Sequence, residues 1–454
     1  MEKQGEQKAS RLVFVLYPFP GHINPMLQLA KILHSKGFSI TIVHPEFNSP
    51  NPSDHLEFTF IPISGNLVES KVSPGDFFDF ISALNKNCEG PLIECIPRMS
   101  KAEDHRDQIS CIIYDGFMYF AQSVADQFKL PGISVRTSPA VTILAFAVFP
   151  RLHEQGYMSF LESVSQDQGP ELQLLRLKEA AALTRETTTY AMLELRAALT
   201  DSMKRCSAII VNTVDFLEKE ALAKVQELFS APTFTIGPFH KLVPTFSSSL
   251  LKEDTDCISW LKRQASKSVI YVSFGSMASV DEKELLEMAW GLANSEQPFL
   301  WVVRPGLVRS LNCLALLPNN FQERVGERGC IVEWAPQKEV LAHDAVGGFW
   351  SHCGWNSTLE SISEGVPMLC KPFFGDQNLS VRYICDVWNV GLELESELER
   401  GKIEKAIKRL MEETEGEEMR KRAILLKEKL KLTLREGGSC YNSLNDLAEK
   451  ILSF

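Results

Sequence analysis

Short β-rich runs alternate with segments of helical periodicity along this chain, and this alternation constrains the fold more than any other feature. The first run, LVFVLYP, begins at Leu12, and residues 26–33 then place apolar side chains at helical spacing. Gly37 ends that segment, and a second β-rich run covers 38–43. Two strands joined by a helix form a βαβ unit, which requires parallel strands and a right-handed crossover. The chain is therefore expected to be an α/β protein built on parallel sheets.

The alternation falls into two blocks, separated by a segment without periodicity. Residues 237–254 are rich in Pro, Ser and other turn-forming residues, which favours a linker. After the second block, residues 401–435 have a charged, helical pattern, and residues 443–452 indicate one more helix. The strand-like runs beyond the first βαβ unit are 111–115, 132–136 and 208–213 before the linker, and 269–276, 299–303 and 347–350 after it.

These patterns predict two domains of similar construction. The N-terminal domain is expected at 1–238, the linker at 239–256 and the C-terminal domain at 257–435. A helix within 436–454 is expected to pack back on the N-terminal domain. Inside the second block, Ser279-Val-Asp-Glu282 matches a capping box, so a helix should begin there.

Composition and charge exclude several classes of protein. Lys and Arg number 47 against 58 Asp and Glu, which gives a net charge of −11 and makes nucleic acid an unexpected partner. The 11 Cys include no C-x-x-C pair, which argues against a disulfide framework and against a zinc site. No signal peptide is recognised, and no apolar run approaches the ~18 residues that span a bilayer. We therefore expect a cytoplasmic protein without stable membrane insertion.

Ligands of open parallel sheets bind beyond the carboxyl ends of the strands, so the loops that follow strands are the expected sites. One such loop, SHCGW, precedes a helical segment at 356–365, and a helix N-terminus attracts phosphate. His352, Asn356 and Ser357 surround this position. Two structural alternatives stay open, because Ser357 and Glu360 also match a capping box and His352 can serve as a turn residue.

The loop after the first strand carries a candidate acid–base residue. His22 lies between Gly21 and the helical segment, and imidazole titrates near neutral pH, so it can act as a general base. Asp115 ends the run CIIYD in the same block and can orient the ring by accepting Nδ1–H. Taken singly, His22 can also be a helix-start residue and Asp115 a turn former.

A third loop follows Val272. Gly275 and Ser276 can bring backbone amides to the same phosphates, or they can form a plain strand-to-helix turn. The chain has no G-x-G-x-x-G, G-x-x-x-x-G-K-[ST] or G-x-S-x-G motif, so dehydrogenase, P-loop and hydrolase functions lose their usual support.

Together these segments resemble one family. Residues 334–377, WAPQKEVLAHDAVGGFWSHCGWNSTLESISEGVPMLCKPFFGDQ, look like the signature box of the plant family 1 UDP-glycosyltransferases of secondary metabolism, and FPGHINPMLQLAKILHSKGFSIT, VIYVSFGS and FLWVVRP fit as well. Within that family the chain is most similar to the group that contains cytokinin and steviol-glycoside glucosyltransferases. The resemblance implies a GT-B fold, in which two doubly wound Rossmann-like domains face each other across a cleft and the C-terminal one holds the sugar donor.

The resemblance also implies roles for residues of the donor site. The indole of Trp334 would stack on uracil, Gln337 would help to hold the uridine, and Glu360 would accept hydrogen bonds from the ribose hydroxyls. Asp376 and Gln377 would bind hexose hydroxyls, and because a final glutamine in this box usually accompanies glucose donors, UDP-glucose is the expected donor. The other expected donor contacts are Ala335, the pyrophosphate-binding residues Ser276, His352, Asn356 and Ser357, and Trp355 at the sugar.

For the reaction, the resemblance implies that His22 takes the acceptor's proton, that Asp115 stabilises the imidazolium, and that the configuration at the anomeric carbon is inverted. Neither a metal nor a cofactor is expected, since UDP-glucose is a co-substrate and fixed donors would stabilise the departing UDP. Apolar residues favour a small lipophilic acceptor, and the protein is expected to be a monomer. The acceptor pocket is expected to include Phe19, Phe117, Thr137, Ser138, Ile143 and Phe146, shaped by residues 66–100 and 140–200.

Three points qualify this prediction. The stretch ELQLLRLKEAAAL at 171–183 is helical in pattern where relatives usually carry a Pro-rich turn, which leaves the acceptor open. Asp254 and Asp256 resemble a D-x-D metal site but fit the start of a helix better. The alternative functions are a UDP-sugar epimerase with this architecture and a non-catalytic protein that binds UDP-sugar or a lipophilic ligand.

Overall fold

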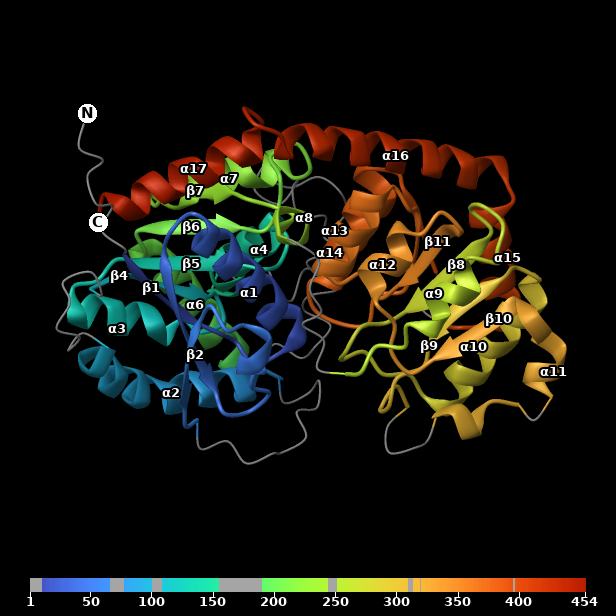
Figure 1. The fold of residues 1–454 in the computed structure, drawn as a ribbon, viewed down its shortest axis with the longest axis horizontal. Coiled ribbons are helices and arrows are strands. Elements are labelled where there is room, and N and C mark those ends of the chain that lie inside the picture. Colours follow the sequence, from blue (N-terminus) through green and yellow to red (C-terminus); the bar gives the residue numbers. More distant parts are fainter. Residues whose placement is uncertain are drawn as a thin grey trace. The chain divides into compact units, whose positions relative to one another are not determined.

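The computed structural model describes residues 10–65, 77–99, 108–154, 190–243, 251–308, 313–318, 320–394 and 397–454. The chain divides into two compact units (Figure 1). Unit 1 comprises Met1–Ser248 and Thr433–Phe454, and unit 2 comprises Ser249–Leu432. The boundary falls inside the segment 239–256 that was expected to be the linker, of which residues 244–250 lie outside the described ranges.

Unit 1 is built on a parallel sheet whose order in the described residues is β3-β2-β1-β4-β5-β6-β7. The direction of winding reverses between β1 and β4, and at such a switch point the two post-strand loops diverge and leave room for a ligand. His22, in the first turn of the helix after β1, and Asp115, the last residue of β4, therefore lie at this switch point. The strands are β1 (Arg11–Val15), β2 (Ser39–Pro45), β3 (Thr59–Ile63), β4 (Ile109–Asp115), β5 (Gly132–Arg136), β6 (Ala208–Val211) and β7 (Thr233–Thr235).

Helices connect these strands, and the last helix of the chain returns to this unit. Helix α17 (Ser439–Leu452) begins four residues before the segment 443–452 that the sequence indicated, and it lies beside β7 (Figure 1). Its Cys440 Sγ accepts from Gly237 N at 3.4 Å, and Ser439 Oγ donates to Asp215 at 3.0 Å. The other helices of unit 1 are α1 (Pro20–Ser35), η1 (Pro52–Asp54), α2 (Phe77–Met99), α3 (Phe120–Phe128), α4 (Ala140–Glu154), α6 (Tyr190–Arg205), α7 (Lys219–Leu228) and α8 (Phe239–Leu242).

Unit 2 repeats the architecture with a sheet of order β10-β9-β8-β11-β12-β13, again parallel. Here the winding reverses between β8 and β11, so the loops that follow these two strands meet at the switch point. These are the SFGS loop and the SHCGW loop of the sequence. The strands are β8 (Val269–Ser273), β9 (Phe299–Val302), β10 (Gly329–Val332), β11 (Val346–Ser351), β12 (Met368–Cys370) and β13 (Gly391–Glu393).

The helices of unit 2 follow the sequence pattern, with one correction. Helix α10 begins at Glu282, and its capping box joins Asp281 to Glu284 rather than Ser279 to Glu282. The helix begins later because Val280 still bridges to Val308 in extended conformation, which excludes a helical turn at 279. The helices are α9 (Asp256–Leu261), α10 (Glu282–Ser295), η5 (Cys313–Leu316), α11 (Phe321–Val325), η6 (Gly326–Arg328), α12 (Gln337–Ala342), α13 (Trp355–Glu364), α14 (Gln377–Arg382), the π-turn η7 (Tyr383–Val387), α15 (Arg400–Met411) and α16 (Thr414–Leu434).

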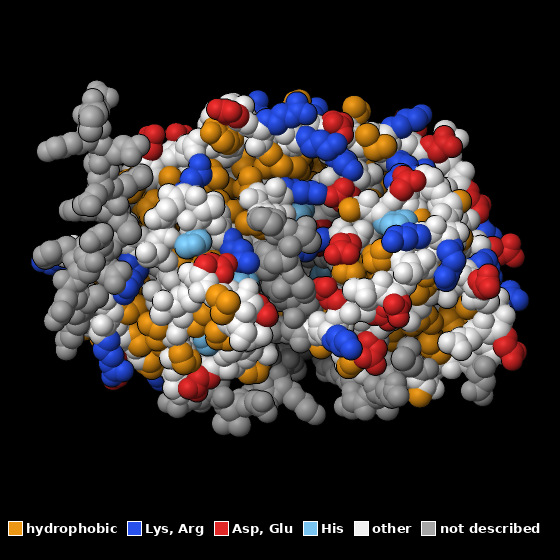
Figure 2. Space-filling model, in the orientation of Figure 1, with side chains coloured by type: hydrophobic (Ala, Val, Ile, Leu, Met, Phe, Trp, Pro, Cys, Tyr) orange, Lys and Arg blue, Asp and Glu red, His pale blue; other side chains and the backbone are white. Residues whose placement is uncertain are grey.

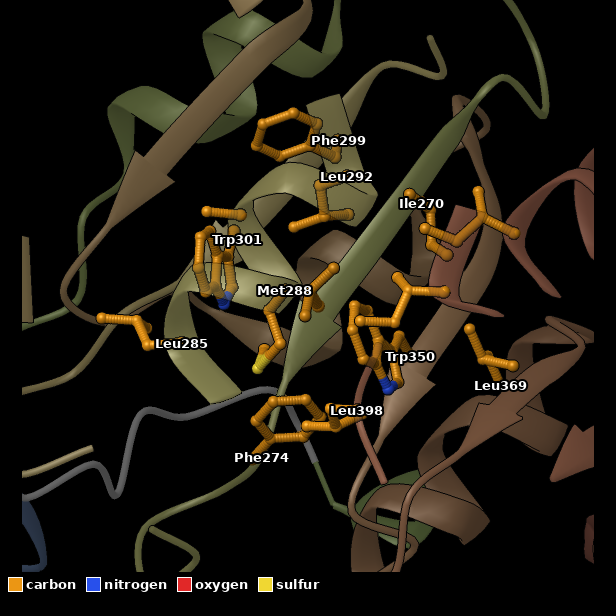
Figure 3. Close-up of a cluster of buried hydrophobic side chains, with 14 of the residues drawn as sticks. Ile270, Phe274, Leu285, Met288, Leu292, Phe299, Trp301, Trp350, Leu369 and Leu398 are labelled. Atoms are coloured by element: carbon orange, nitrogen blue, oxygen red, sulfur yellow. The ribbon is translucent and has the colours of Figure 1, made fainter. Parts of the chain in front are cut away.

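A large apolar core supports the switch point of unit 2. Trp350 of β11 and Phe274, the first residue after β8, meet edge to face with ring centroids 5.6 Å apart (Figure 3). Both side chains are almost fully buried, so the strand ends that carry the two loops are fixed by packing. The labelled members of this core are Ile270, Phe274, Leu285, Met288, Leu292, Phe299, Trp301, Trp350, Leu369 and Leu398.

The surface charges of both signs are mixed. Lys and Arg side chains are interspersed with Asp and Glu over the face shown in Figure 2, rather than gathered by sign. Among the described residues, none of the helices has the combination of length and apolar composition that crossing a bilayer requires.

Candidate functional site

At the switch point of unit 1, His22 and Asp115 form a hydrogen-bonded pair. Pro20 occupies the first position of α1, where its fixed φ suits the helix, and this places His22 in the first turn. The Nδ1 atom of His22 lies 2.8 Å from Oδ2 of Asp115. The Asp115 side chain is nearly inaccessible, and its other oxygen accepts from Phe117 N at 2.9 Å. With both oxygens held, Asp115 fixes the tautomer in which His22 keeps a proton on Nδ1 and a lone pair on Nε2.

Thr137 and Tyr17 also lie against His22. Thr137, expected only as an acceptor-pocket residue, places Oγ1 3.0 Å from the same Nδ1 atom. The ring of Tyr17 meets the imidazole edge to face, with centroids 4.9 Å apart, and burial together with the charge of Asp115 raises the pKa of this phenol well above its usual value. Sequence reasoning did not name Tyr17 as a site residue, although it is the last residue but one of the run LVFVLYP.

The expected acceptor residues separate into two groups. Phe117 contacts His22 with centroids 5.2 Å apart, and Phe19 contacts Tyr17 at 5.1 Å and Phe80 at 5.6 Å, so these rings form an aromatic wall beside the imidazole. Ile143 is fully buried. Much of the expected pocket, residues 66–76, 100 and 155–189, lies outside the described residues, and this includes the stretch 171–183.

The second group gathers around buried guanidinium groups that the sequence did not single out. Arg136 Nη2 donates to Ser138 Oγ at 3.4 Å, and its guanidinium lies 5.6 Å from the centroid of the Phe146 ring. Arg196 of α6 lies 5.8 Å from the same ring. Phe146 thus lies close to two buried cations, in addition to any contact with a ligand.

In unit 2, Gln337 at the start of α12 connects the residues expected to bind the nucleoside. Its Nε2 donates to Glu360 Oε2 at 2.7 Å and lies 3.0 Å from Ser357 Oγ, and Tyr271 OH donates to its Oε1 at 3.2 Å. The capping-box alternative for Ser357 and Glu360 is wrong, because α13 begins at Trp355 after the cap Gly354 and Glu360 is engaged by Gln337. Tyr271 was missed, because its position inside strand β8 looks like ordinary core.

The signature box begins with Trp334 and Ala335, and its first residue contacts the backbone at Asp254. Trp334 is half-buried and Ala335 is buried, and the main-chain oxygen of Trp334 accepts from Asp254 N at 2.8 Å. Asp254 Oδ1 in turn accepts from Asp256 N at 2.8 Å, which supports the reading of this D-x-D as a helix start. No group of three or more metal-binding side chains occurs within the described ranges.

The residues expected to contact the sugar differ in how far their side chains are buried or hydrogen-bonded within the protein. Gln377 is buried and its Oε1 accepts from Phe373 N at 2.8 Å and Phe374 N at 3.2 Å, so its oxygen shapes the turn and only its amide nitrogen is left for a hexose. Asp376 is half-buried at the cap of α14. Trp355 is buried, with its ring 6.2 Å from that of Trp388.

His352 sits in a slot formed by two glycines. A Cβ atom on Gly354 would lie 2.5 Å from His352 Nε2, and one on Gly275 would lie 2.8 Å from the same atom. Gly275 also has φ +66°, a conformation that side chains disfavour. Burial and, to a smaller extent, the charge of Arg304 lower the pKa of His352 to about 4, against a weaker opposing effect of the Ser273 backbone. The half-buried Ser276 lies in the loop after β8, and the half-buried Asn356 lies in the first turn of α13.

Each unit thus carries a parallel, doubly wound sheet with polar side chains at its switch point, and this is the architecture of GT-B glycosyltransferases. The family model of UDP-glucoronosyl and UDP-glucosyl transferase matches residues 211–427. The chain is 46% identical to UDP-glycosyltransferase 76B1 of Arabidopsis thaliana, over 99% of this chain and 100% of that protein. It is 47% identical to UDP-glycosyltransferase 76H1 of Stevia rebaudiana, over 94% of this chain and 100% of that protein.

A comparison with solved structures points to the same family. The structure of Phytolacca americana UGT2 complexed with UDP-2-fluoro-glucose and pterostilbene matches with a TM-score of 0.82 and 27% identity, over 98% of this chain and 100% of that one. The chain therefore belongs to the plant UDP-glycosyltransferase family and is a UDP-glycosyltransferase, which confirms the resemblance and the two Rossmann-like sheets expected from the sequence.

Proposed function

We propose that this enzyme is an inverting glucosyltransferase that uses UDP-glucose to form β-glucosides of small lipophilic plant metabolites, without a metal ion. The observation that carries the proposal is the 2.8 Å hydrogen bond between His22 Nδ1 and the buried Asp115. This pair has the form of a general base with its orienting carboxylate.

In the proposed reaction, Nε2 of His22 takes the proton from the acceptor's nucleophilic atom. That atom forms a bond to the anomeric carbon of glucose while the bond from this carbon to the UDP oxygen breaks, and UDP leaves with the bonding electron pair. Attack on the face opposite UDP converts an α-linked donor into a β-glucoside. Asp115 remains ionised and stabilises the imidazolium that forms.

For the donor, Trp334 stacks on uracil with Ala335 beside it, and Gln337 and Glu360 hold the nucleoside. Gln337 holds Glu360 at 2.7 Å, so the carboxylate is positioned before the ribose arrives. At the hexose, Trp355 lines the site, Asp376 accepts from hydroxyls and Gln377 donates through its amide nitrogen.

The departing UDP gains negative charge, and fixed donors near the start of α13 would stabilise it. The N-terminus of α13 supplies backbone N–H groups, and the side-chain donors come from Ser276, His352, Asn356 and Ser357. Because these groups are set in place by the apolar core, they need little reorganisation during the reaction.

A lipophilic acceptor is supported by the aromatic wall of Phe19, Phe117 and Tyr17 beside His22. The relative from Phytolacca americana was solved with pterostilbene. The monomeric state and the cytoplasmic location expected from the sequence stay predictions.

The test is incubation of the full chain with UDP-glucose and a panel of phenolic, terpenoid and amine acceptors, followed by mass spectrometry and proton NMR of the product. The expected product is heavier than the acceptor by one anhydrohexose unit and shows the large anomeric coupling of a β-glucoside, and a chelator should leave the rate unchanged. An α-linked product would contradict inversion, and a new UDP-sugar formed without acceptor would favour the epimerase.

A further inference from the structure

A buried arginine lies behind the two loops that are proposed to hold the donor diphosphate. Arg304 follows β9, a strand whose own loop was not expected to carry any part of the site, and only 7% of the residue is exposed. Its Nε donates to Gly275 O at 2.8 Å, its Nη2 donates to Ala278 O, and its Nη1 donates to Pro305 O at 3.1 Å. The guanidinium therefore binds the backbone on both sides of Ser276.

The same arginine is linked to His352 through Gly275. The carbonyl of Gly275 accepts from Arg304, and the position of its missing Cβ is 2.8 Å from the imidazole. The apolar core fixes the position of Gly275, because Phe274 directly precedes it and packs against Trp350, as Figure 3 shows. A positive charge is thus held in a defined position close to the imidazole, within a poorly solvated region where charges interact strongly.

We infer that Arg304 is a positioning residue for the donor diphosphate: it fixes the loop around Ser276 and holds a positive charge behind His352. This inference rests on the proposed donor role of these two loops. The hydrogen bonds of Arg304 hold the loop backbone in place, and its positive charge attracts the diphosphate. The same charge disfavours protonation of the His352 imidazole. His352 consequently meets the diphosphate as a neutral N–H donor throughout the neutral pH range.

The charged and polar groups known to act on His352 come from two elements. Arg304 after β9 lowers the pKa of His352, and the Ser273 backbone of β8 raises it. Removal of the arginine charge should therefore move the pKa of His352 upwards, although burial would still hold it below the usual value. In a donor complex the phosphates of UDP-glucose would add a further upward effect, and these phosphates do not titrate between pH 5 and 8 because both are esterified.

The experiment compares Arg304→Met, Arg304→Gln and Arg304→Lys with the original chain. Histidine resonances are followed by NMR against pH without ligand, and His352 is assigned among the 9 histidines by the spectrum of His352→Gln. The affinity for UDP-glucose is measured by calorimetry at pH 5, 6 and 7. Arg324→Met, which removes an exposed arginine of α11 in the same unit, is the matched control.

We expect the His352 titration to move upwards in the Met and Gln variants and to stay in place in the Lys and control variants. At pH 7 the Met and Gln variants should bind UDP-glucose about tenfold more weakly, the effect of losing one favourable charge interaction. Their affinity should then recover several-fold from pH 7 to pH 5, as His352 becomes protonated and attracts the diphosphate, whereas the original chain should show no such gain.

Two results would overturn the inference. One is an unchanged His352 titration in the Met and Gln variants that remain folded by circular dichroism. The other is an Arg304→Lys protein that shares both the shifted titration and the pH-dependent affinity of the Met variant, because the charge would then not be the cause. Failure of the original chain to bind UDP-glucose would instead contradict the proposed function, while the ligand-free titration would still test the role of Arg304.

Discussion

Each unit has a histidine at the switch point of its parallel sheet, His22 in the first turn of the helix after β1 and His352 in the loop after β11, yet the surroundings of the two are opposite. His22 in unit 1 faces a buried carboxylate, Asp115, at 2.8 Å. His352 in unit 2 lies between two glycines with a buried arginine behind it, and burial and that arginine lower its pKa to about 4. The same side chain therefore has a carboxylate partner at one site, and at the other it is kept neutral by its surroundings.

This difference shows that the fold supplies the position and the neighbours supply the chemistry. A carboxylate beside an imidazole orients the ring and stabilises an imidazolium that forms during a reaction. Burial and a nearby cation disfavour the imidazolium, which leaves a ring that can only donate or accept a hydrogen bond. If the comparison is correct, substitutions at the two histidines and their neighbours should affect different kinetic parameters.

The largest effect is expected for His22→Gln. Loss of the general base should lower kcat about 10²–10⁴-fold, while the affinity for UDP-glucose, held by the other unit, should change little. His34→Gln, at the exposed end of the same helix α1, is the matched control and should keep full activity. Initial-rate kinetics with donor calorimetry would measure both parameters, and a His22→Gln enzyme with undiminished kcat would remove the general-base assignment.

Asp115→Asn should have the next largest effect. Asparagine fits the same space, but it replaces the charged acceptor of the Nδ1–H bond, a hydrogen bond worth roughly 1.5–3 kcal/mol, so kcat should fall roughly 10- to 150-fold. Asp126→Asn removes a half-exposed carboxylate on α3 of the same unit and serves as the control. If the fold decreases in kcat of Asp115→Asn and His22→Gln multiply in the double variant, the two residues do not act as a pair. The contrast between His22 and His352 would then not hold.

Much of this arrangement could be predicted from the sequence, and particular residues show why. His22 and Asp115 were named because each ends or follows a strand-like run, and parallel strands bring such positions to one edge of a sheet. The capping box at Ser279 was misplaced because a spacing pattern cannot show that Val280 still bridges to Val308. Arg304 and Tyr271 were missed because an arginine after a strand looks like a surface charge and a tyrosine inside one looks like core, and only tertiary contacts reveal their partners.

Gly354→Ala tests the other side of the comparison. The new methyl group would lie 2.5 Å from His352 Nε2, while Gly275 closes the opposite side, so the ring must leave its slot. Such overpacking costs about 1–3 kcal/mol, and donor affinity should weaken roughly tenfold or more with a lower melting temperature.

Gly401→Ala is the matched control for this change. Gly401 lies in α15 of the same unit, and an added methyl group would meet no other atom within 4 Å. It should leave donor binding unchanged and raise the melting temperature slightly, because alanine favours helix. Unaltered donor affinity in Gly354→Ala would show that the position of His352 does not matter for the diphosphate.

The smallest expected effect distinguishes two roles for Thr137, which was predicted to line the acceptor pocket but contacts His22 Nδ1 at 3.0 Å. Valine has nearly the same shape without the oxygen, so Thr137→Val should lower kcat about 2- to 10-fold, the contribution of one hydrogen bond. Thr137→Ser keeps the oxygen and should restore most of the rate. A positioning role requires the same loss with every acceptor and in the slow hydrolysis of UDP-glucose, since each uses the same base. A pocket role requires instead that the acceptor KM changes by amounts that differ between acceptors, while the rate of hydrolysis stays the same. The two sets of kinetics therefore decide whether Thr137 positions His22 or contacts the acceptor.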